Sequence, residues 1–338
     1  MKIALLFLPA HHLVFDVQMP STIDLDQSDP VSGNVDATVP VIRASELLCG
    51  PDHILIDTVR TACLETGFFY IQPSSIEQEV INQTLGHMET FFAIDDKDPR
   101  KTDIRQVDGK SGWQPKFTEP AYQPGTISSV EAYDFRKNEI ESKNTLWPAI
   151  DGFQHDVVVC WETLLRLADK VLEILALTAG IEADFLALRC GSRALNSMRL
   201  LNYAGDAIEP SDASVGISAH TDFECVTLLY QSAPGLELRT VDGHWLDAAS
   251  GTGHIVVMLD DMLERWTNGY FKATGHRVRK TNRQRFSIVM FVAVDEGLTI
   301  APLEKFITNE NPTAYEPITQ EEHLENEIRR ARENATRL

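Results

Sequence analysis

Cysteine is scarce in this sequence, and the few cysteines have no spacing that would pair them. Their number is odd and no two form a Cys-x-x-Cys motif. A disulfide framework is therefore not expected, and we predict reduced thiols and a cytoplasmic location. The five cysteines are Cys49, Cys63, Cys160, Cys190 and Cys225.

Basic residues are also few relative to acidic ones. The chain has 30 Lys and Arg against 50 Asp and Glu, which gives a formal net charge of −20. A surface of this sign repels nucleic acid and anionic membranes, so neither is expected as a partner. The balance favours an enzyme that acts on a small molecule, or a protein from a salty milieu. We expect a monomer or a weak homodimer.

Long apolar runs are absent as well. No run approaches the ~20 residues that a membrane span needs. The apolar start before Pro9 is short, follows a single Lys and precedes two histidines, which favours a chain that is not secreted and leaves a targeting segment in residues 1–15 as the alternative. With 338 residues and 43% hydrophobic content, the chain can bury a full core.

Sequence texture divides the chain into four regions. Residues 1–37 are rich in Asp, Ser, Gly and Pro and are expected to form a loosely ordered leader. Residues 38–192 carry short strands and three helical patterns, at 52–66, 75–92 and 151–179. Residues 193–300 consist of short apolar runs broken by Gly, Pro, Asn and Asp, which is typical of a β-barrel or jelly roll. Residues 301–338 should form a C-terminal lid and helix, with a capping box at Thr319 to Glu322.

The most informative stretch is a His-x-Asp motif in strand-like sequence. In an extended backbone, residues i and i+2 point to the same face, so His220 and Asp222 can converge on one ion. His276 lies in another strand-like piece downstream. Two histidines and a carboxylate on one face of an iron leave the opposite face open, as in non-haem Fe(II) oxygenases. A structural polar pair is the alternative for His220 and Asp222 taken alone.

Two other His-x-acid pairs occur, at His87 and Glu89 and at His323 and Glu325. Both fall on predicted helices, where residues i and i+2 diverge by ~200° around the axis. They cannot hold one ion together and are interpreted as ordinary helix residues.

A second polar pair lies nine residues beyond His276. Arg285 and Ser287 are again an i, i+2 pair, inside an apolar strand that runs to Val292. An arginine and a hydroxyl on one strand face can grip a carboxylate. The alternative is an arginine that forms a structural ion pair.

This ordered set resembles the iron(II)/2-oxoglutarate-dependent oxygenases of the isopenicillin N synthase-like family. The pattern there is His-x-Asp, a distal His and then Arg-x-Ser, and the likeness extends over roughly residues 38–320. Further similar pieces are Asn202-Tyr203, Thr227–Gln231, Pro234–Leu238, Trp266–Gly269, Thr274–Val278 and Glu65–Ile71.

The resemblance implies both a fold and a site. The fold would be mixed α/β (α+β), with a double-stranded β-helix (jelly roll) core, flanking N-terminal helices and a C-terminal helix. Fe(II) would be bound by His220, Asp222 and His276, with 2-oxoglutarate and O2 as cosubstrates. The far carboxylate of 2-oxoglutarate would be held by Arg285 and Ser287, with Tyr203 and Asn202 as further contacts.

The sequence departs from the family pattern in places that do not touch these ligands. Glu224 stands where a small residue is common, Asp260 stands where the family usually has Gly, and residues 291–295 lack the usual proline. The chemistry implied is oxidation of a small-molecule metabolite, as in secondary metabolism, with release of succinate and CO2. Hydroxylation is the default outcome, and desaturation and ring closure remain open. The alternatives are a family member that works without 2-oxoglutarate and a non-catalytic jelly-roll binding protein.

Substrate contacts are expected outside the shared motifs. The irregular segment from Trp113 to Phe135 is long, aromatic and rich in Gly and Pro, which favours the wall of a substrate pocket. The stretch from Phe306 to Tyr315 is expected to cover the substrate. The residues predicted to contact substrate are Trp113, Phe117, Tyr133, Phe135 and Phe291.

Overall fold

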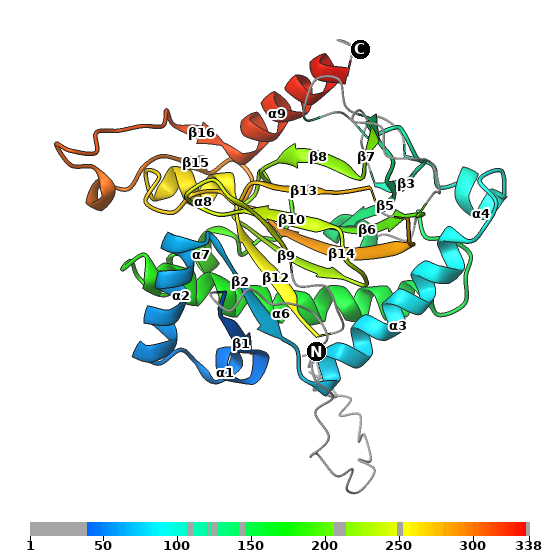
Figure 1. The fold of residues 1–338 in the computed structure, drawn as a ribbon, viewed down its shortest axis with the longest axis horizontal. Coiled ribbons are helices and arrows are strands. Elements are labelled where there is room, and N and C mark those ends of the chain that lie inside the picture. Colours follow the sequence, from blue (N-terminus) through cyan, green and yellow to red (C-terminus); the bar gives the residue numbers. More distant parts are fainter. Residues whose placement is uncertain are drawn as a thin grey trace, which may run out of the picture. The chain divides into compact units, whose positions relative to one another are not determined.

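Two β-sheets pack face to face in the computed structural model, and helices cover the outer face of the larger sheet (Figure 1). This is the mixed α/β architecture that the sequence predicts. The predicted leader, residues 1–37, lies outside the described part of the chain. The structure describes residues 39–106, 111–119, 122, 127–141, 146–205, 214–248, 253–280 and 282–335.

The larger sheet has eight strands, all antiparallel to their neighbours except the parallel pair β1 and β2. Its central strand β14 is buried on both faces, which explains why its sequence is almost continuously apolar. The strands in spatial order are β1 (Val41–Arg43), β2 (Phe68–Gln72), β12 (Ile255–Leu259), β9 (Val226–Gln231), β14 (Arg285–Val292), β6 (Ser197–Tyr203), β5 (Glu131–Arg136) and β3 (Gly112–Gln114).

The smaller sheet has four antiparallel strands. A core of alternate residues from both sheets fills the space between them and includes Leu201, Leu229, Leu238 and Val278. The strands in order are β11 (Trp245–Asp247), β10 (Leu236–Arg239), β13 (His276–Val278) and β8 (Ile217–His220). Two short pairs accompany these sheets: β4 (Ile127–Ser128) with β7 (Ser214–Val215), and β15 (Thr299–Ile300) with β16 (Ile318–Thr319).

Three long helices close the outer face of the larger sheet. They are α2 (His53–Glu65), α3 (Ser75–Phe92) and α6 (Phe153–Thr178), each within about two residues of its predicted bounds. Helix α6 buries an apolar stripe that includes Val157, Leu164, Val171 and Leu175 against the sheet. The short helices are α1 (Ala44–Cys49), α4 (Pro99–Thr102), α5 (Lys137–Glu141), α7 (Phe185–Arg189), α8 (Asp261–Trp266) and the 3-10 helix η1 (Glu304–Phe306).

The C-terminal helix α9 (Gln320–Ala335) lies on the opposite side of the molecule from α3 and α6 (Figure 1). The predicted capping box is present: the Glu322 N–H donates to Thr319 Oγ1 at 3.2 Å, and the Thr319 N–H donates to Glu322 Oε2 at 3.1 Å. This capping fixes the start of a helix that contributes to the site described below.

The domain boundary expected at residue 193 stays a prediction. Strands from both sides of it form the larger sheet, in which β1, β2, β3 and β5 come from the N-terminal region. All five cysteines are free, and four of them are buried. Among the described residues, each helix is too short or too polar to serve as a membrane span.

Candidate active site

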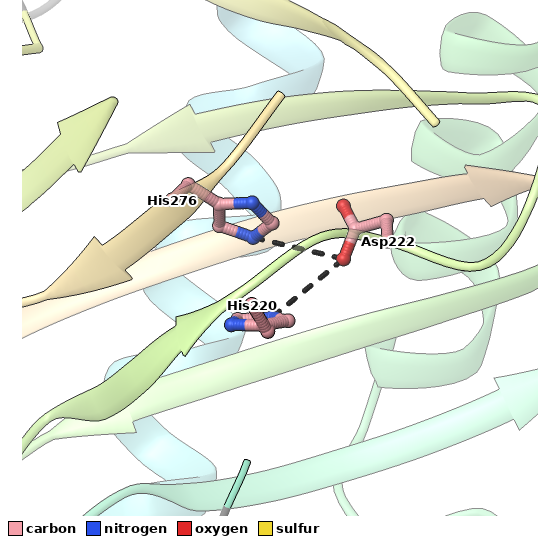
Figure 2. Close-up of side chains that lie close together, drawn as sticks. All are labelled: His220, Asp222 and His276. Carbon is pink, nitrogen blue, oxygen red and sulfur yellow. Dashed lines mark ion pairs between the residues drawn. The ribbon is translucent and has the colours of Figure 1, made fainter. Parts of the chain in front are cut away.

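The side chains of His220, Asp222 and His276 point toward one another (Figure 2). His220 ends β8 and His276 begins β13, and the two residues pair directly across these antiparallel strands. Asp222 follows in the turn after β8. Its Oδ1 atom lies 3.7 Å from His220 Nε2 and 3.6 Å from His276 Nε2. The three predicted metal ligands therefore offer their donor atoms to one point, within 4.8 Å of one another.

Both imidazole rings are held in the tautomer that a metal needs. His220 Nδ1 lies 2.8 Å from the Ser218 carbonyl oxygen, and His276 Nδ1 lies 3.1 Å from the Thr274 carbonyl oxygen. A carbonyl can only accept, so each Nδ1 carries the proton and each Nε2 presents its lone pair to the shared point. Burial, followed by the nearby His276, lowers the pKa of His220 well below its usual value, which favours the neutral form.

Asp222 is buried, and its Oδ2 atom has no hydrogen-bond partner among the described residues. Burial raises the pKa of this carboxyl group, although His276 opposes the shift. A buried carboxylate with an unsatisfied oxygen beside two neutral imidazoles fits a divalent cation. The donor set is the two-histidine, one-carboxylate combination of non-haem iron sites.

The backbone around Asp222 is fixed from two directions. The carbonyl oxygens of Asp222 and Glu224 accept the N–H groups of Asp261 at 3.1 Å and Met262 at 2.9 Å, at the start of α8. The carbonyl oxygen between them, that of Phe223, accepts from Gln320 Nε2 at 2.8 Å, at the start of α9. Residues 222–224 are called the metal turn below. Their three consecutive carbonyl groups are therefore held by the two helices.

Arg285 is completely buried at the start of β14. Its guanidinium group donates to Gln231 Oε1 at 3.0 Å and to the Ala233 carbonyl oxygen at 3.2 Å, and it stacks 4.7 Å from the Tyr203 ring. In the described part of the chain no carboxylate pairs with it. Arg285 Nη1 and the Ser287 hydroxyl, both buried, also lack partners there. Burial lowers the pKa of Arg285, as expected for a cation without a counterion.

A buried guanidinium without an anion is costly, so this site fits a ligand carboxylate. The prediction that Arg285 and Ser287 share one face is consistent with the strand geometry. Tyr203 pairs with Arg285 across β6 and β14 and lies on the same face. Asn202 differs from expectation: it points to the helix-covered face, where its amide donates to Glu131 at 3.0 Å. Adjacent strand residues face opposite sides, so Asn202 cannot join Tyr203 at this site.

A cavity of about 240 Å³ adjoins the metal ligands. His220 and Asp222 line its inner end, and Phe291 lines a wall, which is consistent with the expectation that it contacts substrate. Helix α9 provides another wall through Leu324 and Ile328. Glu224, the last residue of the metal turn, also lines the cavity. Burial and the nearby Asp222 raise the pKa of its carboxyl group to about 8.

Three of the other residues expected to contact substrate, Trp113, Phe117 and Tyr133, do not line the cavity. Trp113 and Tyr133 are buried between the larger sheet and the helices, where Trp113 Nε1 donates to Glu131 at 2.8 Å. Phe135 packs in the same core against Trp161 and only borders the cavity. Phe117 is 56% exposed and does not line the cavity. The aromatic pattern predicts a pocket wall, but most of these rings belong to the hydrophobic core.

The predicted cover also differs from the observed one. Within the stretch from Phe306 to Tyr315, Phe306 is buried against Tyr270, and the Tyr315 hydroxyl donates to Glu264 of α8. The cavity wall comes instead from α9, which the sequence identified as a helix but not as part of the site.

Sequence reasoning also missed a cavity-lining group around Arg199 of β6. Its guanidinium pairs with Glu119 and Asp134, and Tyr122 stacks on His220 with ring centroids 4.3 Å apart. The sequence did hold a signal for this group. Arg199, Leu201 and Tyr203 are spaced two residues apart in one strand, so their side chains lie on the same face.

Two family models match the chain. Residues 195–294 match the model of the 2OG-Fe(II) oxygenase superfamily, and residues 39–150 match the N-terminal model of non-haem dioxygenase in morphine synthesis. The 2-oxoglutarate-Fe(II) type oxidoreductase of Aspergillus fumigatus is 28% identical, over 84% of this chain and 89% of that protein. The homoarginine-6-hydroxylase of Oryza sativa is 26% identical, over 80% of this chain and 87% of that protein.

Solved structures agree with this fold. A 2OG-Fe(II) oxygenase family protein from Caulobacter crescentus superposes with a TM-score of 0.72 at 27% identity, covering 86% of this chain and 98% of that one. A full-length protein of Neurospora crassa, solved in complex with alpha-KG (2-oxoglutarate), has a TM-score of 0.74 at 22% identity and covers 87% of this chain and 96% of that one.

Proposed function

Since this chain belongs to the 2OG-Fe(II) oxygenase superfamily, we propose that His220, Asp222 and His276 bind its iron and that Arg285 and Ser287 bind its 2-oxoglutarate. The protein is an oxidoreductase that uses Fe(II), 2-oxoglutarate and O2 to oxidise a small-molecule metabolite, with release of succinate and CO2. The observation that carries the residue assignment is the convergence of both Nε2 atoms on Asp222, next to a buried arginine without a counterion.

We further propose that the two sheets form a double-stranded β-helix. From β6 to β14 the chain passes between the larger sheet (β6, β9, β12, β14) and the smaller one (β8, β10, β11, β13). Eight antiparallel strands in two facing sheets are the arrangement of a jelly roll. In this arrangement β8, the turn that follows it and β13 carry the metal ligands, while β14 and β6 carry the cosubstrate site.

The residues of the chain have separate tasks in this reaction. The Nδ1–H bonds to Ser218 and Thr274 aim the two Nε2 lone pairs at the metal, and Asp222 supplies the negative ligand. Arg285 and Ser287 donate to the far carboxylate of 2-oxoglutarate and so fix its orientation. Bound iron supplies the oxidising chemistry between 2-oxoglutarate, O2 and substrate.

The adjoining cavity is the proposed substrate site, because it reaches both His220 and Asp222. Phe291 would contact the substrate from β14, and α9 would cover it. Hydroxylation is the proposed outcome, in secondary metabolism. One relative, the homoarginine-6-hydroxylase of Oryza sativa, is named for the hydroxylation of a small molecule. The net charge of −20 supports a protein that does not bind nucleic acid or anionic membranes. The five free cysteines support a cytoplasmic location, and we propose a monomer or weak homodimer.

A family member that works without 2-oxoglutarate is the second candidate, and a non-catalytic binding protein is the third. The uncompensated charge of Arg285 favours the first two candidates over the third, because it fits a ligand carboxylate next to the metal site. The test is succinate release from 2-oxoglutarate under air with Fe(II), across a panel of small metabolites. Succinate formation that depends on substrate, and is lost in Asp222→Ala, supports the proposal. Full turnover without 2-oxoglutarate would establish the second candidate instead.

A further inference from the structure

A second buried charged group lies in the cavity, outside the metal and cosubstrate sites. Arg199 of β6 donates from Nε to Asp134 Oδ1 at 2.8 Å and from Nη2 to Glu119 Oε2 at 2.8 Å. Its Nη1 donates to Glu119 Oε1 at 3.2 Å, and Nη2 also reaches Gln114 Oε1 at 3.1 Å. The Tyr122 hydroxyl donates to Glu119 as well, at 3.1 Å. All five residues line the cavity.

The charges in this cluster do not cancel. One guanidinium faces two carboxyl groups, so the positive charge of Arg199 is already committed. Burial opposes ionisation of Glu119, but Arg199 outweighs it and lowers the pKa of that carboxyl group. Burial raises the pKa of Asp134, whose negative charge is in excess. This cluster therefore offers hydrogen-bond acceptors to a ligand, and its own cation, Arg199, is already paired with carboxylates. Arg136 and Arg332 line the cavity outside the cluster.

The position of the cluster separates it from the cosubstrate site. On the inner face of β6, Tyr203 pairs with Arg285, and Arg199 pairs with Val289 four residues further along. Four residues of strand span about 13 Å. Ser197, the next inward residue, pairs with Phe291. The Arg199 cluster thus lies on the side of the metal turn where the substrate cavity is, away from Arg285.

Apolar side chains make up about half of the rest of the cavity lining. Phe223, Phe291, Leu324 and Ile328 form the surfaces opposite and beside the cluster. Arg136 and Arg332 also line the cavity; Arg136 pairs with Ser197, one step along the strand beyond Arg199, and Arg332 lies on α9. An apolar body with one polar end matches this lining.

We propose that Glu119, Asp134 and Arg199 form a selectivity wall for a small, mostly apolar substrate whose polar end carries an amine or another hydrogen-bond donor. A carboxylate at that end is rejected, because it would meet the excess negative charge of Asp134. The inference rests on the proposed function only in that the cavity must be the substrate site.

Binding of matched probes tests the charge preference. Tryptamine, tryptophol and indole-3-propionate share an indole and an ethyl spacer and differ in the charge of the end group. Phenethylamine, 2-phenylethanol and 3-phenylpropionate repeat the series on a smaller ring. Titration calorimetry uses the full chain loaded with Mn(II) and 2-oxoglutarate, without O2. In at least one series we expect the amine to bind at least tenfold more tightly than the carboxylate, with the alcohol between them.

Asp134→Asn then removes the excess negative charge while keeping the size of the side chain. The amine should lose most of its advantage over the carboxylate in this variant. Asp169→Asn is the matched control, since it also removes a carboxylate that pairs with an arginine, Arg193, but outside the cavity, and it should leave the order unchanged. If Asp134→Asn does not fold, Glu119→Gln serves the same purpose, because it removes the other carboxylate.

The outcomes separate this proposal from the proposed function. Binding of 2-oxoglutarate is titrated in the same protein before any probe is added, and its failure would count against the cosubstrate site alone. The selectivity wall is refuted if the carboxylates bind most tightly, if Asp134→Asn keeps the wild-type order, or if no probe of either series binds at millimolar concentration. An amine preference that Asp134→Asn removes and Asp169→Asn preserves would establish it.

Discussion

Replacing Arg285 by glutamine isolates the contribution of the buried guanidinium. In the absence of ligand, Arg285 has hydrogen bonds to Gln231 and Ala233 but no counterion among the described residues. Loss of those bonds and relief of a desolvated charge act in opposite directions. We therefore expect the free energy of unfolding without 2-oxoglutarate to change by less than about 1 kcal/mol.

The effect on cosubstrate binding should be much larger. Losing the charged partner of a buried carboxylate costs about 2–4 kcal/mol, which is roughly a 30- to 1000-fold rise in Kd. At a concentration of about 100 times the wild-type Kd, 2-oxoglutarate stabilises the wild type by about 2.7 kcal/mol. A hundredfold weaker variant gains only about 0.4 kcal/mol at the same concentration.

Thermal unfolding with Mn(II), with and without 2-oxoglutarate and in the absence of O2, measures both effects together. Arg60→Gln is the control, because Arg60 bonds to the Thr178 carbonyl oxygen and Asp57, away from the cavity. Equal stabilisation of wild type and Arg285→Gln by 2-oxoglutarate would refute the assignment of this residue.

Four further predictions concern other parts of the molecule. His276→Ala should lose Mn(II) binding, measured by calorimetry, while its circular dichroism stays that of the wild type; retained binding would mean that the ligand set is wrong. Trp113→Phe should lower the free energy of urea unfolding by about 1–3 kcal/mol, because Glu131 loses a buried donor, and should leave probe affinity unchanged. Thr319→Ala should cost about 0.5–2 kcal/mol and speed hydrogen exchange in α9, whereas unchanged exchange would show that the cap is not needed. Burial lowers the pKa of His254, so as pH falls the unfolded chain takes up a proton at this imidazole before the folded chain does. The free energy of unfolding should therefore fall as pH drops below about 6.5. Urea midpoints of His254→Gln should fall less than those of the wild type over the same pH range.

Residue spacing alone predicted much of the site. The i, i+2 rule placed His220 with Asp222 and Arg285 with Ser287 on shared faces, because both pairs lie in or beside extended strands. Helical periodicity gave α2, α3 and α6 within about two residues, since each buries one continuous stripe.

What could not be read from the sequence is which face of a strand meets the cavity. Tyr133 and Phe135 alternate with Asp134 on β5, and pattern alone does not say whether the aromatic or the charged face is inward. In the structure the aromatic face of β5 packs against the helices, so Asp134 on the other face lines the cavity. The error at Asn202 could have been avoided from the sequence. Adjacent residues of a strand face opposite sides of the sheet, so Asn202 and Tyr203 cannot both contact the cosubstrate. The role of α9 depends on a tertiary contact that no local pattern records.

The carbonyl groups of Asp222, Phe223 and Glu224 are each held by a hydrogen-bond donor of the chain itself. Iron entering such a site need not order the chain around it, so little of its binding energy is spent on folding. Two of these restraints come from α8, within the sheet scaffold, and one comes from Gln320 at the start of α9. Shortening the chain before Gln320 would therefore weaken the hold on iron as well as opening the cavity, which makes the C-terminal helix a part of the metalloenzyme's centre although it contributes no ligand.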